Sequence, residues 1–248
     1  MDHAILLSGG VGTRISSDIP KQYTRVNGRM MVTYALSALI SSPHVDELCV
    51  VADPAWQQEI MEDLGPVMNG AEKPVFFAAP GANRQLSIWN GLQQILNTRD
   101  ITAADDDVSE DTVFIHDAAR PYISKQLIDA CYEALPGHDG VLPVLPMKDT
   151  VYESRDGHSI DRLLDRSRIF AGQAPELFML EKYVEANRAL LPERILSING
   201  STEPAILAGM DIAMIPGDEK NSKVTTNADL ERFREYTADE STGSAFHM

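Results

Sequence analysis

The chain has 248 residues and a formal net charge of −16 at pH 7, which disfavours binding to a nucleic acid polymer. Because the overall field would repel an anionic ligand, such a ligand needs cations gathered at its site. The two cysteines, Cys49 and Cys131, lie far apart in apolar segments and indicate neither a disulfide framework nor a zinc site. No signal-like or membrane-spanning apolar run is present, so the sequence predicts a cytoplasmic protein that does not bind membranes.

A glycine-rich segment follows the first predicted strand, residues 3–7. The segment Ser8-Gly9-Gly10-Val11-Gly12-Thr13-Arg14 can bring several backbone N–H groups close to a phosphate. Its spacing differs from the dinucleotide fingerprint G-x-G-x-x-G and from the Walker loop. Lys21, in Pro20-Lys21-Gln22-Tyr23, adds a cation, and the pattern suits a nucleoside triphosphate. A tight strand-to-helix turn with two surface cations is the alternative.

Strands and helices alternate along the rest of the chain. We expect helices over residues 30–39, 56–64, 84–96, 181–191 and 227–236, and strands over 47–52, 73–79, 112–116, 140–146 and 211–215. This alternation predicts parallel crossovers and a doubly wound, mostly parallel, Rossmann-like α/β sheet. In such a sheet the ligand crevice lies at the carboxyl ends of the strands.

Two polar segments lie where predicted strands end. Arg84 and Ser87 begin a helix, where they could bind an anion or a nucleobase edge, or simply cap that helix. In the stretch His116-Asp117-Ala118-Ala119-Arg120-Pro121, the carboxylate could hold a hydroxyl or a metal ion. A helix cap by Asp117, with Arg120 as its salt-bridge partner, is the alternative. We expect His116 to be structural, because it faces the opposite way from Asp117.

A polar stretch around Asp156-Gly157 lies between the apolar positions Val151 and Ile160, a pattern typical of a β-hairpin that reaches out of the domain. Residues 99–111 form an acidic loop to which we assign no chemistry. From residue 237 onward the sequence is polar and small, which predicts a flexible tail at 237–248.

Several motifs, in order over residues 3–236, resemble those of the sugar nucleotidyltransferases. The resemblance is specifically to the cytidylyltransferases that make CDP-methylerythritol or CDP-ribitol from CTP and a polyol phosphate. The motifs are L-S-G-G-V-G-T-R-(x)5-P-K-Q-Y, G-x-x-R-x-x-S-(x)2-N-G-L, H-D-A-A-R-P, a Q-T-P-Q-like segment at 173–176 and G-(x)3-N-x-K-[IV]-T. The resemblance implies one domain over residues 1–236, with a protruding β-arm at about 147–168 that embraces a second subunit in a homodimer.

The resemblance also implies roles for individual residues. Those implied to stabilise the reacting phosphorus are Arg14, Lys21 and Lys223. Those implied to bind CTP are Ser8, Gly9, Gly10, Val11, Gly12, Thr13, Arg84 and Ser87. Those implied to bind the acceptor are Asp117 and Arg120, with Asp149, Thr150 and Arg166 working across the dimer interface. Mg2+ would bridge the CTP phosphates, and no residue is predicted as a metal ligand.

The sequence departs from the family pattern on the acceptor side. Ala174 and Glu176 replace the Thr and the second Gln of Q-T-P-Q, and Asn199-Gly200 replaces a Thr-Asp pair, unless a shifted alignment places Thr202 and Glu203 there. The favoured acceptor is 2-C-methyl-D-erythritol 4-phosphate, with ribitol 5-phosphate or another polyol phosphate as the alternative. A catalytically silent nucleotide-binding regulator is a third possibility. The glycine spacing disfavours an NAD-binding protein.

Overall fold

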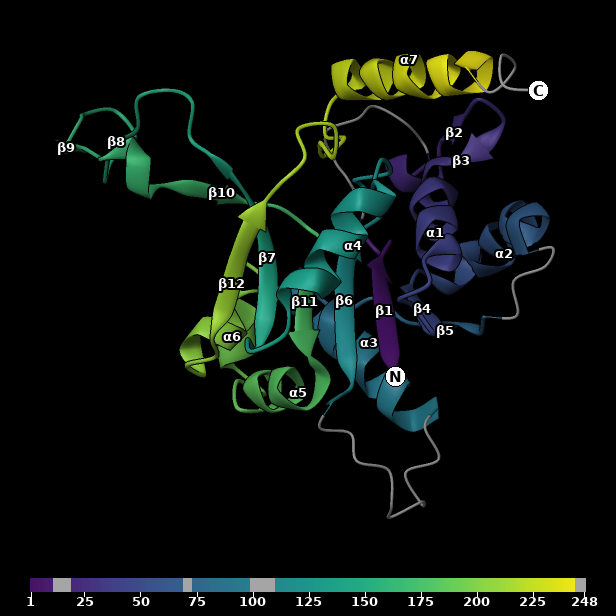
Figure 1. Cartoon of the computed structure of the whole chain (residues 1–248), viewed down its shortest axis with the longest axis horizontal. Coiled ribbons are helices and arrows are strands. Elements are labelled where there is room, and N and C mark those ends of the chain that lie inside the picture. The colour runs from purple at the N-terminus through teal and green to yellow at the C-terminus, as the bar shows by residue number, and fades with distance from the viewer. Residues whose placement is uncertain (11–18, 69–72, 99–109, 244–248) are drawn as a thin grey trace.

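The computed structural model describes residues 1–10, 19–68, 73–98 and 110–243 (Figure 1). Four residues of the predicted phosphate loop, Val11, Gly12, Thr13 and Arg14, therefore lie outside the described part. Within that part, no helix has the length and apolar character needed to cross a membrane.

The core of the molecule is an eight-stranded, mostly parallel sheet, as the sequence predicts. Strands β5 (Val75–Ala78), β4 (Glu47–Val51), β1 (Asp2–Leu7) and β6 (Thr112–Asp117) are parallel neighbours in that order. Strand β11 (Glu176–Met179) runs antiparallel between β6 and β7 (Gly140–Pro146). Strands β10 (Phe170–Gly172) and β12 (Ile212–Pro216) also pair with β7, antiparallel and parallel respectively.

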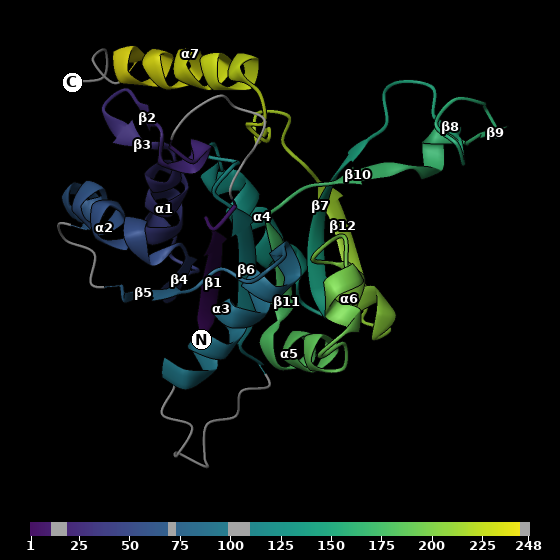
Figure 2. The same ribbon diagram turned by 180° about the vertical axis from the view of Figure 1, so that it is seen from behind.

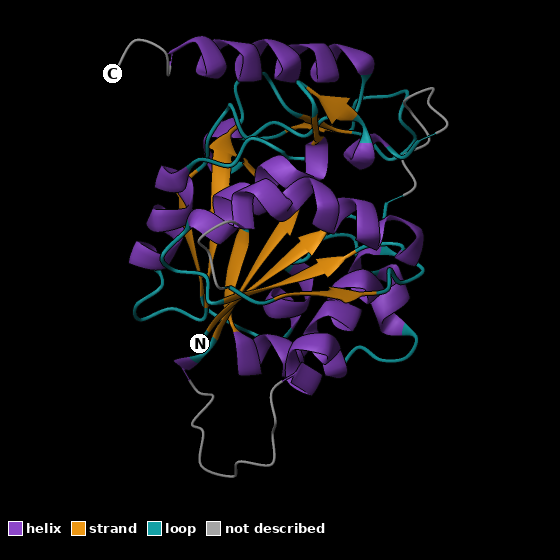
Figure 3. Cartoon of the chain, turned by 90° about the vertical axis from the view of Figure 1, so that its right-hand side faces the viewer, coloured by secondary structure: helices purple, strands orange, loops and turns teal. Residues whose placement is uncertain are grey.

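Helices cover both faces of this sheet (Figures 1 and 2). Helices α1 (Met31–Ser41), α2 (Pro54–Met68) and α4 (Lys125–Ala134) pack on one face, which includes Leu6 and Phe114. Helices α3 (Arg84–Thr98), α5 (Leu180–Arg188) and α6 (Glu203–Leu207) pack on the other, which includes Ile5 and Ile115. Because side chains alternate along a strand, two sequence neighbours supply the two cores. Figure 3 shows the strands between these helical layers.

Two hairpins leave the sheet. The predicted arm contains β8 (Tyr152–Glu153) and β9 (Arg162–Leu163), and it projects away from the other elements (Figure 1). Gly157, in the predicted turn, has a φ of 73°, a conformation that glycine adopts without steric cost. The sequence did not predict the second hairpin, β2 (Arg25–Val26) and β3 (Arg29–Met30), which turns at Asn27-Gly28.

The structure differs from the sequence-based prediction at several elements and boundaries, among them one helix, the end of β6 and the end of the last helix. Helix α4 was not predicted, although Ser124 caps it by accepting from the Leu127 N–H at 3.2 Å. Strand β6 includes Asp117 rather than ending at His116. Helix α7 (Asn227–Gly243) continues beyond Tyr236, because Thr237 is buried and accepts a hydrogen bond from the side chain of Asn27 at 2.7 Å.

Gly140 gives a direct test of how tightly the sheet is packed. A Cβ at this position would lie 2.6 Å from the Phe178 ring and 2.7 Å from the Leu177 carbonyl oxygen. We expect Gly140→Ala to lower the free energy of unfolding by about 1–3 kcal/mol, as overpacking does in other cores. Gly172→Ala is the control, since its Cβ would meet nothing closer than 3.6 Å. Urea titration followed by circular dichroism measures both, and equal stability of the two variants would contradict the packing argument.

Candidate active site

The parallel strands end together at one edge of the sheet. Leu7 pairs with both Val51 and Asp117, and Val51 pairs with Ala78. The segments that follow β1, β4, β5 and β6 therefore meet, which is where a doubly wound sheet binds its ligand. A cavity of about 540 Å³ opens between these segments. Its lining includes predicted residues from both ends of the chain, namely Ser8, Gly9, Gly10, Lys21, Arg84, Ser87, Asp117 and Lys223.

Side chains from the short helix η1 (Lys21–Tyr23) hold the start of the glycine-rich segment. The Gln22 amide donates to the carbonyl oxygens of Ser8 and Gly10, both at 2.7 Å, and the Tyr23 hydroxyl donates to that of Ser8 at 2.8 Å. Gly9 has no room for a side chain, because a Cβ there would overlap Pro80. The backbone of residues 8–10 is thus held by these contacts before any ligand binds.

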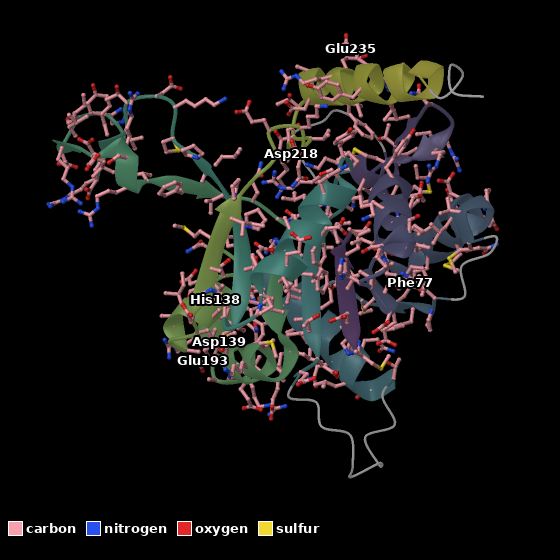
Figure 4. The ribbon with its side chains drawn as sticks, viewed as in Figure 1. Phe77, His138, Asp139, Glu193, Asp218 and Glu235 are labelled. Atoms are coloured by element: carbon pink, nitrogen blue, oxygen red, sulfur yellow. The ribbon has the colours of Figure 1, made fainter. Side chains whose placement is uncertain are left out.

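Two predicted cations, Lys21 and Lys223, line the same cavity. The Lys21 ammonium donates to the carbonyl oxygen of Val224 at 2.7 Å, and the Val224 N–H donates to the Ala119 carbonyl oxygen at 2.7 Å. Lys223 lies on the segment between β12 and α7, which also carries Asp218, labelled in Figure 4. The backbone of Val224 thus connects the two lysines to the end of β6.

An ion group centred on the buried carboxylate of Asp117 links Arg84 to Lys223. Arg84 donates to Oδ1 of Asp117 from Nη2 at 2.8 Å and from Nε at 3.1 Å, and Lys223 donates to Oδ2 at 3.0 Å. Burial opposes ionisation of Asp117, but Arg84 and Lys223 overcome this effect and hold the pKa of its carboxyl well below the usual range. Both carboxylate oxygens are therefore occupied by cations.

Arg120 is not the salt-bridge partner of Asp117, which was the alternative interpretation of this motif. In the described structure Asp117 forms its ion pairs with Arg84 and Lys223. Arg120 instead donates to the Asn221 carbonyl oxygen at 2.7 Å, and the Asn221 amide donates to the Ala174 carbonyl oxygen at 2.7 Å. Arg120 is close to Asp117 in sequence, but its guanidinium hydrogen-bonds to the distant segment after β12.

His116 has a structural environment, in agreement with the prediction. Its side chain is fully buried, and its Nε2 lies 2.8 Å from the carbonyl oxygen of Arg120. Burial lowers the pKa of His116 to about 4, so the imidazole is neutral at physiological pH and donates from Nε2. Ser87 shapes the neighbouring loop, because its hydroxyl accepts from the Gly81 N–H at 3.0 Å and donates to the Asn83 carbonyl oxygen at 2.9 Å.

Three predicted acceptor residues, Asp149, Thr150 and Arg166, lie outside this cavity within one chain. All three are exposed on the arm, where Arg166 donates to the carbonyl oxygen of Lys148 at 2.8 Å. Their predicted role across a dimer interface stays a prediction.

The structure adds residues that the sequence-based prediction did not assign to the site. Asp53, after β4, and Asn83, after β5, line the cavity, and the Gln22 side chain holds its glycine-rich wall. Glu176, known from the sequence only as a departure from the family motif, lies beside Arg84 with its Oε2 3.7 Å from Nη2. For Asp53 and Asn83, the only signal in the sequence is a polar residue soon after the end of a predicted strand.

The described residues include no group of three or more His, Cys, Asp or Glu side chains able to hold a metal ion. The cavity nevertheless combines backbone amides, two lysines and an arginine at one sheet edge. That arrangement can bind a polyanionic ligand with a neutral portion, as a nucleotide has.

Comparison with known proteins identifies relatives along nearly the whole chain. Residues 3–238 match the family model described as IspD, 2-C-methyl-D-erythritol 4-phosphate cytidylyltransferase. The bifunctional enzyme IspD/IspF of Paramagnetospirillum magneticum is 33% identical over 93% of this chain and 55% of its own length, so the chain spans about half of that relative. The 2-C-methyl-D-erythritol 4-phosphate cytidylyltransferase of Lachnospira eligens is 30% identical over 93% of this chain and 96% of its own length.

One relative carries a different name. The ribitol-5-phosphate cytidylyltransferase of Streptococcus pneumoniae is 26% identical over 93% of this chain and 96% of its own length. Among solved structures, the 4-diphosphocytidyl-2C-methyl-D-erythritol synthase of Anaerococcus prevotii has the same fold, with a TM-score of 0.76, 22% identity and 96% coverage of both chains. The family match over residues 3–238 carries the assignment, and the chain belongs to the 2-C-methyl-D-erythritol 4-phosphate cytidylyltransferase family.

Proposed function

We propose that this chain transfers the CMP group of CTP to a polyol phosphate and releases pyrophosphate. The observation that carries the proposal is the pair Lys21 and Lys223 in one cavity with the glycine-rich segment and the Arg84–Asp117 pair. The cations and backbone amides suit the triphosphate, and Asp117 holds the guanidinium of Arg84 at the cavity, where its remaining N–H groups can donate to the neutral part of the nucleotide. Family membership supports cytosine as the base.

In this proposal, an oxygen of the acceptor phosphate attacks the α-phosphorus of CTP in line. The bond from that phosphorus to the β-bridging oxygen breaks, and pyrophosphate leaves with the electron pair. Because the nucleophile is already an anion, the chain must align the two phosphates and stabilise charge rather than remove a proton. Lys21 and Lys223 supply that charge from fixed positions, and Arg14 is proposed to act with them.

We propose that Mg2+ enters as part of the nucleotide substrate, bound by the CTP phosphates. Both oxygens of Asp117 already accept from cations, and the described residues form no acidic cage, so the chain offers no competing site there. A bound Mg2+ would neutralise phosphate charge. In this scheme the residues of the chain orient the phosphates and do not ligate the ion.

For the acceptor we propose 2-C-methyl-D-erythritol 4-phosphate, the substrate named by the family model. Ribitol 5-phosphate is the second candidate, supported by the Streptococcus pneumoniae relative. Ala174 and Asn199-Gly200 stand where the family motifs have threonines, so the acceptor phosphate would lose hydroxyl donors. Each lost hydrogen bond is worth about 0.5–1.5 kcal/mol.

Lysine variants test the reaction. We expect Lys21→Ala and Lys223→Ala each to lower kcat for pyrophosphate release from CTP by about 10²–10³-fold, as the loss of a charge-stabilising donor does elsewhere. Lys220→Ala is the matched control, because Lys220 is exposed on the same segment as Lys223. The assay offers methylerythritol phosphate and ribitol 5-phosphate in parallel, with Mg2+.

Each result has a distinct meaning. Turnover of one acceptor, lost in the two lysine variants but kept in the control, supports the reaction and identifies the acceptor. If CTP binds but no pyrophosphate is released from it with either acceptor, the transferase proposal is contradicted. The alternative of a nucleotide-binding regulator would then remain.

The Gln22 contacts give a second test. Gln22→Ala removes both hydrogen bonds to the glycine-rich segment, and we expect the Kd for CTP to rise about tenfold, since two bonds of this kind are worth about 1–3 kcal/mol together. Titration calorimetry measures the change. Gln58→Ala on the exposed face of α2 serves as the control, and equal Kd values for both variants would contradict a clamping role.

We propose a homodimer formed through the arm. Ile160 and Leu163 are 68% and 63% exposed on an element that has no core of its own, which is typical of an interaction site. We expect Leu163→Asp to shift the sedimentation coefficient toward that of a monomer and to raise KM for the acceptor, because Arg166 would no longer reach a second site. A monomeric wild-type protein with full activity would contradict this proposal. Arg155→Ala, on the exposed polar turn of the arm, is the control.

A further inference from the structure

A second buried carboxylate, which the proposed mechanism does not use, lies next to Arg84. Glu176 is the first residue of β11, is 7% exposed and lies one strand away from Asp117. Its Oε1 accepts a hydrogen bond from the Ser201 hydroxyl. Its Oε2 is buried without a hydrogen-bond partner and lies 3.7 Å from Nη2 of Arg84. The charge of Glu176 is therefore balanced by Arg84.

Glu176, Arg84, Asp117 and Lys223 form a row of alternating charges. The side chains of the two carboxylates are 10% and 11% exposed, whereas those of Arg84 and Lys223 are 32% and 43% exposed. Both cations line the cavity, but Glu176 does not. The row is neutral as a whole, so the guanidinium presents less positive potential to a ligand than an unpaired arginine would.

We propose that Glu176 sets the affinity of this site for its nucleotide, because its buried carboxylate offsets the positive charge that Arg84 presents to the cavity. The inference rests on the proposed function, since it takes CTP as the ligand. Glu176 acts through Arg84 and is a positioning and affinity-setting residue rather than a catalytic one. The family motif has Gln at this position, so an amide of the same shape is compatible with the fold.

The other groups that face Glu176 do not duplicate its charge. Asp117 is already shared by two cations, and Arg120 adds a positive charge. From α4, Cys131 is a neutral thiol, because burial raises its pKa to about 12. From α5, Tyr183 is a neutral phenol, because burial raises its pKa as well. Ser201 is the remaining hydrogen-bond partner and carries no charge.

The degree to which Glu176 offsets the charge of Arg84 depends on pH. Burial raises the pKa of Glu176, and the attraction of Arg84 opposes that rise without cancelling it. Below this raised pKa the carboxyl is neutral, and the row gains one net positive charge. CTP should therefore bind more tightly to the wild type as the pH falls through the titration of Glu176. The Glu176→Gln variant should bind CTP tightly over the whole pH range.

The experiment compares CTP binding by the wild type, Glu176→Gln and the control Glu181→Gln, whose site lies exposed at the start of α5. Titration calorimetry without acceptor gives Kd between about pH 5 and about pH 9, a range that covers raised carboxyl pKa values. Protonation of CTP itself affects all three proteins equally, so the ratio of Kd values reports on Glu176. At the alkaline end we expect Glu176→Gln to bind about three- to tenfold more tightly than the wild type, with the ratio approaching one in acid.

Thermal unfolding without nucleotide shows whether the variant folds. A raised folded-state pKa stabilises the wild type at low pH, and this stabilisation is lost as pH rises through the titration of Glu176. We therefore expect the Tm of Glu176→Gln to exceed that of the wild type in alkali and to approach it in acid.

CTP binding by all three proteins with equal Kd at every pH would overturn this inference and leave the proposed function standing. Weaker binding by Glu176→Gln would also overturn it, because the carboxylate would then support the nucleotide. If the wild type and Glu176→Gln both fold and neither binds CTP, the proposed function fails, and this inference fails with it.

Discussion

The carboxylate of Asp117 is the interaction on which the rest of the site depends. It is buried at the end of the central strand, where an ionised carboxyl is stable only if cations and hydrogen bonds replace the lost water. Arg84 and Lys223 supply both, and removing either cation would leave the buried carboxylate without one of its partners. The three residues follow β5, end β6 and follow β12, so the ion group forms only when the sheet is complete.

The second constraint is that both cavity lysines are held by backbone carbonyl groups or carboxylates before a ligand arrives. Lys21 donates to Val224, and the segment that carries Val224 continues into α7. That helix packs through Leu230 and Phe233 against Val26 and Met31, near the amino-terminal part of the chain. Catalysis of phosphoryl transfer depends on charges that need no rearrangement during the reaction, and this packing provides such preorganisation.

The sequence predicts the parallel strands of the sheet and the edge where they end, because these buried strands are short apolar runs and the glycine-rich segment stands out by composition. It also predicts that Lys21, Arg84, Asp117 and Lys223 share one site. It does not predict which of them pair, because pairing depends on strand order and register. Arg120 illustrates the difference, since it is near Asp117 in sequence and hydrogen-bonds to a segment 101 residues away.

One helix and one helix boundary differ from the sequence-based prediction, for different physical reasons. The helix at 125–134 has a capping serine and buried Leu127, Ile128 and Cys131, so its local sequence does carry a helix signal. The extent of α7 depends instead on tertiary contacts, since the hydrogen bond between Asn27 and Thr237 joins residues at opposite ends of the chain. A polar, weakly amphipathic terminal sequence gives no local sign of such a contact.

Under the proposed function, Ala174 lies on the acceptor side of the site, and its backbone contacts bear on how that side could vary separately from the nucleotide side. The Asn221 amide donates to the backbone carbonyl of residue 174, and Arg120 donates to the backbone carbonyl of Asn221. These bonds do not use the side chain at 174, so they hold the segment that carries Lys223, two residues after Asn221, whichever side chain stands there. The same scaffold can therefore keep its geometry for the nucleotide while the groups that contact the acceptor vary, and relatives with two different named acceptors fit that separation.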